Sequence, residues 1–138
     1  MKNKSQEENK LGWFYNPQPV TIPENLKEKL ESKAKNIMDE LKKEYIKEKN
    51  PNNDYNYVVD IYCKWIGKRF YFCSRYNCPS RRAISPSFES KFARIECIGD
   101  NRFQLFFMRH TGQWIKLYHD ISLEKTFEAI RKNPWFRP

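Results

Sequence analysis

Residues 57–75 read YVVDIYCKWIGKRFYFCSR, and this stretch decides the fold. From Tyr57 to Trp65, every second side chain is apolar or aromatic, which is the two-residue period of a β-strand. Residues 66–69 contain Gly67 and form a short turn, and a second aromatic run follows over residues 70–75. Two such runs around a short glycine-containing loop predict a β-hairpin.

Three further strands are predicted after this hairpin. The alternation resumes over residues 92–98, and Gly99-Asp100-Asn101 forms a turn into a strand over residues 102–110. Thr111-Gly112 then leads to a last strand over residues 114–118. Residues 76–90 contain Pro79, Pro86 and several serines and are predicted to form a long exposed loop, a kind of segment that often carries function.

Helical periodicity flanks the predicted strands on both sides. A helix is expected from Pro23 to about Lys47, with Thr21 as a possible cap and with one apolar stripe made of Leu26, Leu30, Ala34, Ile37, Met38, Leu41 and Tyr45. Ser122 is a predicted N-cap for a short helix that buries Leu123, Phe127 and Ile130. We therefore expect an α+β fold, an antiparallel sheet of about five strands with an N-terminal and a C-terminal helix packed on one face.

Length and composition favour one small domain. The 138 residues are 39% hydrophobic, enough for a core of their own, and we assign residues 21–138 to a single α+β domain. Residues 1–20 are expected to be a polar tail followed by an extended aromatic arm. No apolar run approaches the roughly 18 residues of a membrane span, and no signal peptide is evident, so we expect a cytoplasmic protein without membrane contact. The glycine motifs of dinucleotide-binding and P-loop sites are missing.

Positive charge is concentrated in the strand region. Residues 1–50 hold eleven basic and nine acidic side chains, a net charge of +2, whereas residues 51–138 hold fifteen and eight, a net charge of +7. A field of this sign attracts polyanions and gives salt-sensitive, sequence-independent affinity for phosphates. The alternative interpretation is that the charge serves solubility alone or reflects a host whose proteins are rich in lysine and asparagine.

Several short motifs resemble a known family. They are Lys91-Phe92-Ala93-Arg94-Ile95, the run from Gln104 to Arg109, the run from Gly112 to Tyr118, and the terminal aromatic pair Trp135 and Phe136. Their order is similar to that of a bacterial family catalogued as domain of unknown function 3024, over about residues 57–138. This chain departs from the family pattern at Phe107, where the family favours tryptophan, and at Pro138, where it favours glycine. The resemblance implies the fold and a bacterial source, and it implies no activity.

The four cysteines do not have the spacing of a metal site. Cys63, Cys73, Cys78 and Cys97 are ten, five and nineteen residues apart, so the chain contains no Cys-x-x-Cys pair. Cys63 and Cys97 are expected on the apolar face of the sheet, and Cys73 and Cys78 are expected to be exposed near the loop. We predict reduced thiols, no metal and no cofactor.

Catalytic residues are not evident either. His110 and His119 lie at predicted strand ends on the same edge of the sheet, where a general base could act. No nucleophile lies near them in the sequence, and Asp60, Glu96 and Asp120 are not linked by a motif. We therefore expect a non-catalytic protein, and the competing hypothesis of a hydrolase would depend on His110, His119 and Asp120.

A basic and aromatic sheet face is the leading candidate site. Nucleic-acid binding is expected through Tyr62, Lys64, Arg75 and Arg94 on this face, with Arg81 and Arg82 of the loop clamping the backbone. The wider set of side chains expected on the face includes Tyr71, Gln104, Phe106 and, from the last strand, Trp114, Lys116 and Tyr118. Bases can stack on rings while Lys and Arg contact phosphates. Alternatively, these aromatic residues only support the fold from within.

A second functional hypothesis uses the aromatic residues of the two termini. In it the protein is a protein-interaction or self-associating module whose partner is another protein or a second copy. Aromatic side chains dominate the energetics of protein contacts. The docking residues would be Trp13, Phe14, Tyr15, Trp135 and Phe136.

Overall fold

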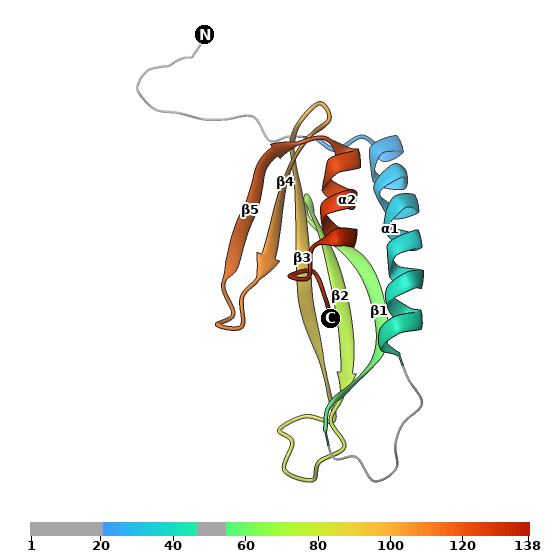
Figure 1. Ribbon diagram of the computed structural model, residues 1–138, viewed down its shortest axis with the longest axis vertical. Coiled ribbons are helices and arrows are strands. Elements are labelled where there is room, and N and C mark those ends of the chain that lie inside the picture. Colours follow the sequence, from blue (N-terminus) through green and yellow to red (C-terminus); the bar gives the residue numbers. More distant parts are fainter. Residues whose placement is uncertain (1–20, 47–54) are drawn as a thin grey trace.

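The computed structural model describes residues 21–46 and 55–138 (Figure 1), so the expected tail and aromatic arm lie outside the described residues. A helix opens the described chain, five strands follow, and a second helix comes after them. The elements are α1 (Glu24–Tyr45), β1 (Tyr57–Ile66), β2 (Arg69–Asn77), β3 (Ser87–Gly99), β4 (Arg102–Met108), β5 (Trp114–Ile121) and α2 (Leu123–Lys132).

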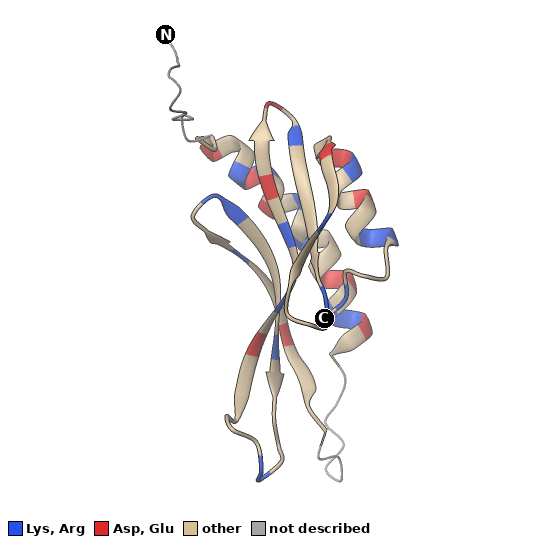
Figure 2. Cartoon of the chain, turned by 90° about the vertical axis from the view of Figure 1, so that its left-hand side faces the viewer, with Lys and Arg blue, Asp and Glu red and all other residues tan. Residues whose placement is uncertain are grey.

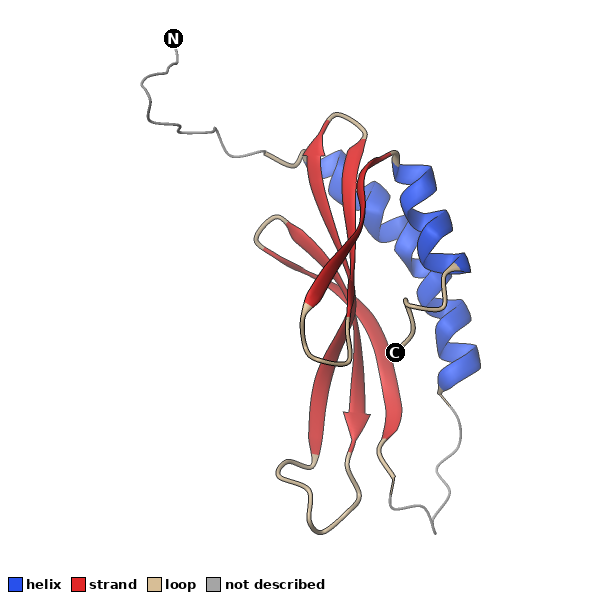
Figure 3. Ribbon diagram, turned by 60° about the vertical axis from the view of Figure 1, so that its left-hand side comes forward, coloured by secondary structure: helices blue, strands red, loops and turns tan. Residues whose placement is uncertain are grey.

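The five strands form one antiparallel meander. Their spatial order is β1-β2-β3-β4-β5, so each strand pairs with its neighbour in the sequence. Both helices lie on the same face of this sheet (Figure 3). The predicted α+β fold and the predicted placement of its two helices are therefore confirmed.

Apolar stripes attach the helices to the sheet. In α1 the buried residues are Leu30, Ala34, Ile37 and Leu41, which follow the expected spacing. The N-cap of α1 is Pro23 and not Thr21, and the helix ends at Tyr45, slightly earlier than expected. The N-cap of α2 is Ser122, as predicted, and its hydroxyl accepts a hydrogen bond from the Lys125 backbone N–H.

Aromatic rings fill the space between the sheet and the helices. Phe70, Phe72, Phe103 and Phe136 are fully buried there, together with aliphatic residues from every layer. The rings of Phe72 and Phe127 are 6.4 Å apart, which links the centre of the sheet to α2. The inward side of the sheet is thus a hydrophobic core, which leaves the opposite side for polar residues.

The β2–β3 hairpin is longer than the sequence predicted. Cross-strand pairs continue through Arg75 with Glu89 and Tyr76 with Phe88 to Asn77 with Ser87. The expected loop of residues 76–90 therefore shrinks to residues 78–86, because pairing with the neighbouring strand extends both strands beyond the region of clear alternation.

Irregular pairing marks every strand pair of the sheet. One register shift occurs in each of the first three pairs. The β4–β5 pair has two, between Phe103 and Leu105 and between Leu105 and Phe106. Shifts of this kind add local twist and change the face on which a side chain lies.

No helix among the described residues has the length and apolar character needed to cross a membrane.

Candidate nucleic-acid interface

The sheet face opposite the helices is called here the outer face. Figure 2 marks the positions of the charged residues along the strands. No described helix covers the outer face. Followed across the strands, the register places seven basic and three acidic side chains on it: Lys64, Arg69, Arg75, Lys91, Arg94, Arg102 and Lys116, with Glu89, Glu96 and Asp120. Asp60, at the β1 edge, pairs instead with Lys42 of α1.

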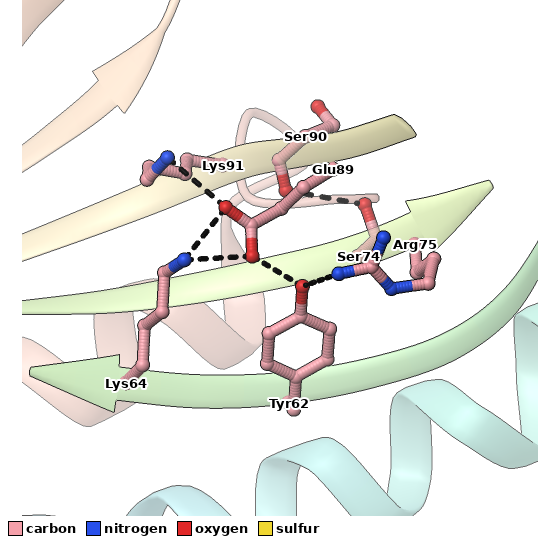
Figure 4. A network of polar contacts seen from close by, with 7 residues as sticks. All are labelled: Tyr62, Lys64, Ser74, Arg75, Glu89, Ser90 and Lys91. Atoms are coloured by element: carbon pink, nitrogen blue, oxygen red, sulfur yellow. Dashed lines mark hydrogen bonds and ion pairs between the residues drawn. The ribbon is translucent and has the colours of Figure 1, made fainter. Parts of the chain in front are cut away.

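One carboxylate organises the β1–β2–β3 end of this face (Figure 4). Lys64 Nζ lies 2.8 Å from both carboxylate oxygens of Glu89, and Lys91 Nζ lies 3.1 Å from Oε1. The Tyr62 hydroxyl donates to Glu89 Oε2 and accepts a hydrogen bond from Arg75 Nη2 at 3.2 Å. We call these five residues the Glu89 cluster; it carries three cations and one anion.

The pKa values within the cluster follow from these contacts. Hydrogen bonds from Lys64 and Tyr62 lower the pKa of Glu89 to about 2, so the carboxylate is ionised throughout the physiological range. Burial and the bond to Glu89 raise the pKa of Tyr62 to about 12. The hydrogen bond to Glu89 also raises the pKa of Lys64. Glu89 is therefore ionised, Lys64 is protonated and Tyr62 is neutral near neutral pH.

Cys73 lies within this region but is closed to solvent. It pairs with Tyr62 on β1 and with Lys91 on β3, and it is fully buried. The expectation of an exposed Cys73 was wrong, because its neighbours on the outer face cover it. Burial raises the pKa of its thiol to about 11, so the thiol is protonated and unreactive at neutral pH.

Arg94 occupies a second cluster in the middle of the outer face. Its guanidinium carbon lies 4.0 Å from the Phe106 ring centre and 5.1 Å from that of Trp114. Its Nε is 2.9 Å from Glu96 Oε2, an ion pair in which neither atom has hydrogen-bond geometry. Arg69 also pairs with Glu96, at 3.1 Å. Arg94 is on the predicted face but is only 9% exposed. Its main role is therefore to pack against its neighbours, and little of its charge is accessible to a ligand.

Lysine and arginine side chains cover the aromatic rings of the outer face. Lys91 lies over Tyr71, and both Arg94 and Lys116 lie over Phe106. Tyr71 and Phe106 are buried. Little ring surface is therefore left for the base stacking that had been expected. The exposed groups of this face are mainly cations, which are suited to contacts with phosphates.

The histidines do not come together. His110 lies in the β4–β5 turn, whereas His119 is near the far end of β5, where its Nδ1 is 2.9 Å from Gln104 Nε2. Asp120 is paired with Arg102 at 2.9 Å, which lowers the pKa of Asp120. The expectation that both histidines share one edge was wrong, because they lie near opposite ends of β5.

Tyr118 was expected to share the face of Lys116, but it does not. It pairs with the core residue Leu105 and lines a cavity of about 390 Å³ against α2.

Arg81 and Arg82 are exposed near the middle of the β2–β3 loop, residues 78–86. The ion pairs found among the described residues include neither of them. Of the predicted set, therefore, Tyr62, Lys64 and Arg75 share one cluster, Arg94 lies in another, and the two loop arginines lie at the hairpin tip.

The terminal aromatic residues have different environments. Phe136 is fully buried in the core, so it has no surface to offer a partner. Trp135 is exposed and stacks on Phe107 with ring centres 5.0 Å apart. Trp13, Phe14 and Tyr15 lie outside the described residues. The four cysteines are free thiols, and the described part of the chain contains no group of three side chains suited to a metal ion.

Two residues of the Glu89 cluster were missed by the sequence interpretation. Glu89 and Lys91 fell within or next to the predicted loop, so the strand alternation was not followed through them. The two-residue spacing of Glu89 and Lys91 was the available signal. The register shift at residues 72–73 of β2, however, cannot be read from the sequence, so the β2 partners of these two residues could not be predicted.

The comparison with protein families identifies this architecture. The model of a family described as "Domain of unknown function (DUF3024)" matches residues 29–138. The chain belongs to this family. The DUF3024 match begins inside α1, so it includes most of the first helix as well as the strand region where the sequence motifs showed the resemblance. Neither the curated proteins nor the solved structures include a significant match.

Proposed function

We propose that this domain binds nucleic acid, RNA or DNA, through the outer face of its sheet. The observation that carries the proposal is the charge of this face, seven basic and three acidic side chains on a surface that no described helix covers. A polyanion that contacts several of these cations releases its condensed counterions, which drives association. The cations also raise the rate of encounter with a polyanion.

Phosphate contacts, and not base stacking, would provide the affinity. Arg75 and Lys116 support this mechanism best, because both are exposed and neither pairs with a carboxylate among the described residues. Lys64 and Lys91 share a single carboxylate, Glu89, and so keep a surplus positive charge. The domain would act by binding alone, in the cytoplasm of a bacterium, a location with which four free thiols agree.

Fluorescence anisotropy with labelled RNA and DNA, repeated over a range of salt concentrations, tests the proposal. We expect the double variant Arg75→Gln/Lys116→Gln to bind about tenfold more weakly near 0.1 M salt, since each lost phosphate contact removes its share of counterion release. The slope of log affinity against log salt should become shallower by about 1.4 to 1.8, the value for two contacts.

The double variant Lys29→Gln/Lys35→Gln is the matched control. It removes the same charge from exposed positions of α1, on the opposite side of the sheet. Its affinity should stay close to that of the unmodified protein. An equal loss in both variants would mean that net charge and not the outer face causes binding, and an unmodified protein that fails to bind at low salt would disprove the proposal.

A further inference from the structure

The tip of the β2–β3 hairpin, residues 78–86, exposes an apolar side chain. Ile84 has a relative exposure of 106%, so it makes no packing contact of consequence with the rest of the domain. Arg81 and Arg82 are exposed in the same loop. A fully exposed isoleucine in the same loop as two arginines is suited to a partner with an apolar interior and an anionic exterior.

Hydrogen bonds hold the backbone of this loop. The Cys78 N–H donates to the Pro86 carbonyl at 2.8 Å and closes the base of the loop. Within it, the Ala83 N–H donates to the Ser80 carbonyl at 3.1 Å, and the Ser85 hydroxyl donates to the Ser87 carbonyl at 2.7 Å. The loop is thus tied at its base and across its turn, and Ile84 is presented from a defined backbone.

A pair of stacked rings links the ends of β2 and β3 that lead into the loop. Tyr76 and Phe88 face each other across β2 and β3, with ring centres 5.0 Å apart and ring planes 3° from parallel. The loop projects past the ends of both helices (Figures 1 and 3), so neither helix obstructs access to it. A two-stranded ribbon with an exposed tip can enter a groove without distorting the rest of the domain.

The tip continues the basic surface of the outer face. Arg75 of the Glu89 cluster is separated from the loop by only two residue pairs, Tyr76 with Phe88 and Asn77 with Ser87. Lys64 and Lys91 follow further along the same sheet. One extended anionic partner could therefore contact the sheet with its phosphates and receive the tip at the same time.

We propose that the partner is double-stranded DNA and that Ile84 inserts between base pairs from the minor groove. This inference rests on the proposed function and names its substrate class. Apolar side chains, isoleucine included, are used as minor-groove wedges that partly unstack a base step and kink the duplex, with arginines beside them in the groove. Arg81 and Arg82 fill the arginine role, and the Glu89 cluster contacts the backbone of the bent flank.

Double-stranded DNA fits the tip better than an anionic membrane does. A bilayer would meet the tip alone, and a single isoleucine with two arginines falls short of the two anchoring signals that stable membrane attachment requires. The cations of Arg75, Lys64 and Lys91 lie away from the tip along the sheet, where a long duplex reaches them and a planar membrane does not.

Binding to intact and nicked duplexes of about 20 base pairs tests the inference, because a nick removes much of the cost of bending. We expect the unmodified protein to prefer the nicked duplex by about tenfold and to shorten the end-to-end distance measured by fluorescence transfer. Ile84→Ser should reduce the preference to less than about twofold while it keeps most of the affinity for intact duplex, which phosphate contacts provide. Ile84→Leu should retain the preference.

Ile66→Ser is the matched control, because Ile66 is an exposed isoleucine at the β1–β2 turn. It should leave both the preference and the bending unchanged. A preference for nicked DNA that survives in Ile84→Ser, binding restricted to single strands, or an effect of Ile84→Ser confined to anionic vesicles would each overturn this inference while the outer-face proposal remained. An unmodified protein that binds no nucleic acid would remove both.

Discussion

Replacing Glu89 with glutamine should change stability and nucleic-acid affinity in opposite directions. Glu89 accepts hydrogen bonds from Lys64, Lys91 and Tyr62, and its pKa is about 2. A depression of this size from 4.5 is equivalent to about 3 kcal/mol at most. The side chain is 18% exposed, and screening by solvent leaves about 1–2 kcal/mol as the loss of stability expected for Glu89→Gln.

Affinity for nucleic acid should rise in the same variant. Loss of the carboxylate frees Lys64 and Lys91 for phosphates, and one additional phosphate contact near 0.1 M salt corresponds to about three- to tenfold tighter binding. Glu128→Gln is the control, because Glu128 also pairs with a lysine, Lys132, but lies on α2. It changes the net charge equally and should leave the affinity almost unchanged.

The stability difference should depend on pH with a definite sign. The pKa of Glu89 is lower in the folded than in the unfolded protein, so the carboxylate stabilises the fold fully above pH 4.5. This contribution disappears as the pH falls from 4.5 towards 2, because the unfolded chain takes up its proton first. Urea unfolding at pH 7 and pH 3 should therefore show a larger gap between the two proteins at pH 7.

Two results would refute this reasoning about Glu89. Weaker binding by a folded Glu89→Gln protein would mean that the carboxylate orients the lysines for their ligand and does not compete with it. An affinity equal to that of Glu128→Gln would mean that the ligand does not contact the cluster. Anisotropy titrations at two salt concentrations, paired with the unfolding curves, distinguish these outcomes.

Two further predictions concern stability. Phe72→Ala should lower the free energy of unfolding by about 3–5 kcal/mol, since Phe72 is fully buried between the sheet and α2 and leaves a cavity; a loss below about 1 kcal/mol in urea unfolding would contradict this packing. Ser122→Ala should cost about 1 kcal/mol through loss of the cap on α2. The exposed helix residue Ser32 is the control, because Ser32→Ala should leave the free energy of unfolding unchanged or slightly raised when both variants are unfolded in urea.

Local patterns were enough to predict the order of the secondary structure. The alternation from Tyr57 to Trp65 and the turn at Gly67 define the first hairpin, and Ser122 followed by Leu123, Phe127 and Ile130 defines α2. Each of these signals lies within about two turns of helix or a single strand. Each could be interpreted without knowing which distant segment it packs against.

The depth and partners of the outer-face residues depend on pairing between distant strands. The face of Arg94 followed from alternation, but its burial arises because Phe106 of β4 and Trp114 of β5 converge on it. Cys73 is covered by its outer-face neighbours for the same reason. Register shifts determine these encounters, and short sequence motifs do not reveal where a shift occurs.

The irregular β5 strand affects how the protein behaves at high concentration. Within the described sheet β5 is an edge, and a regular edge invites a neighbouring chain to add a further strand. The two shifts opposite β4 break the even row of backbone groups that such an addition needs. Continuous sheet extension from one molecule to the next is thereby discouraged along the β5 side.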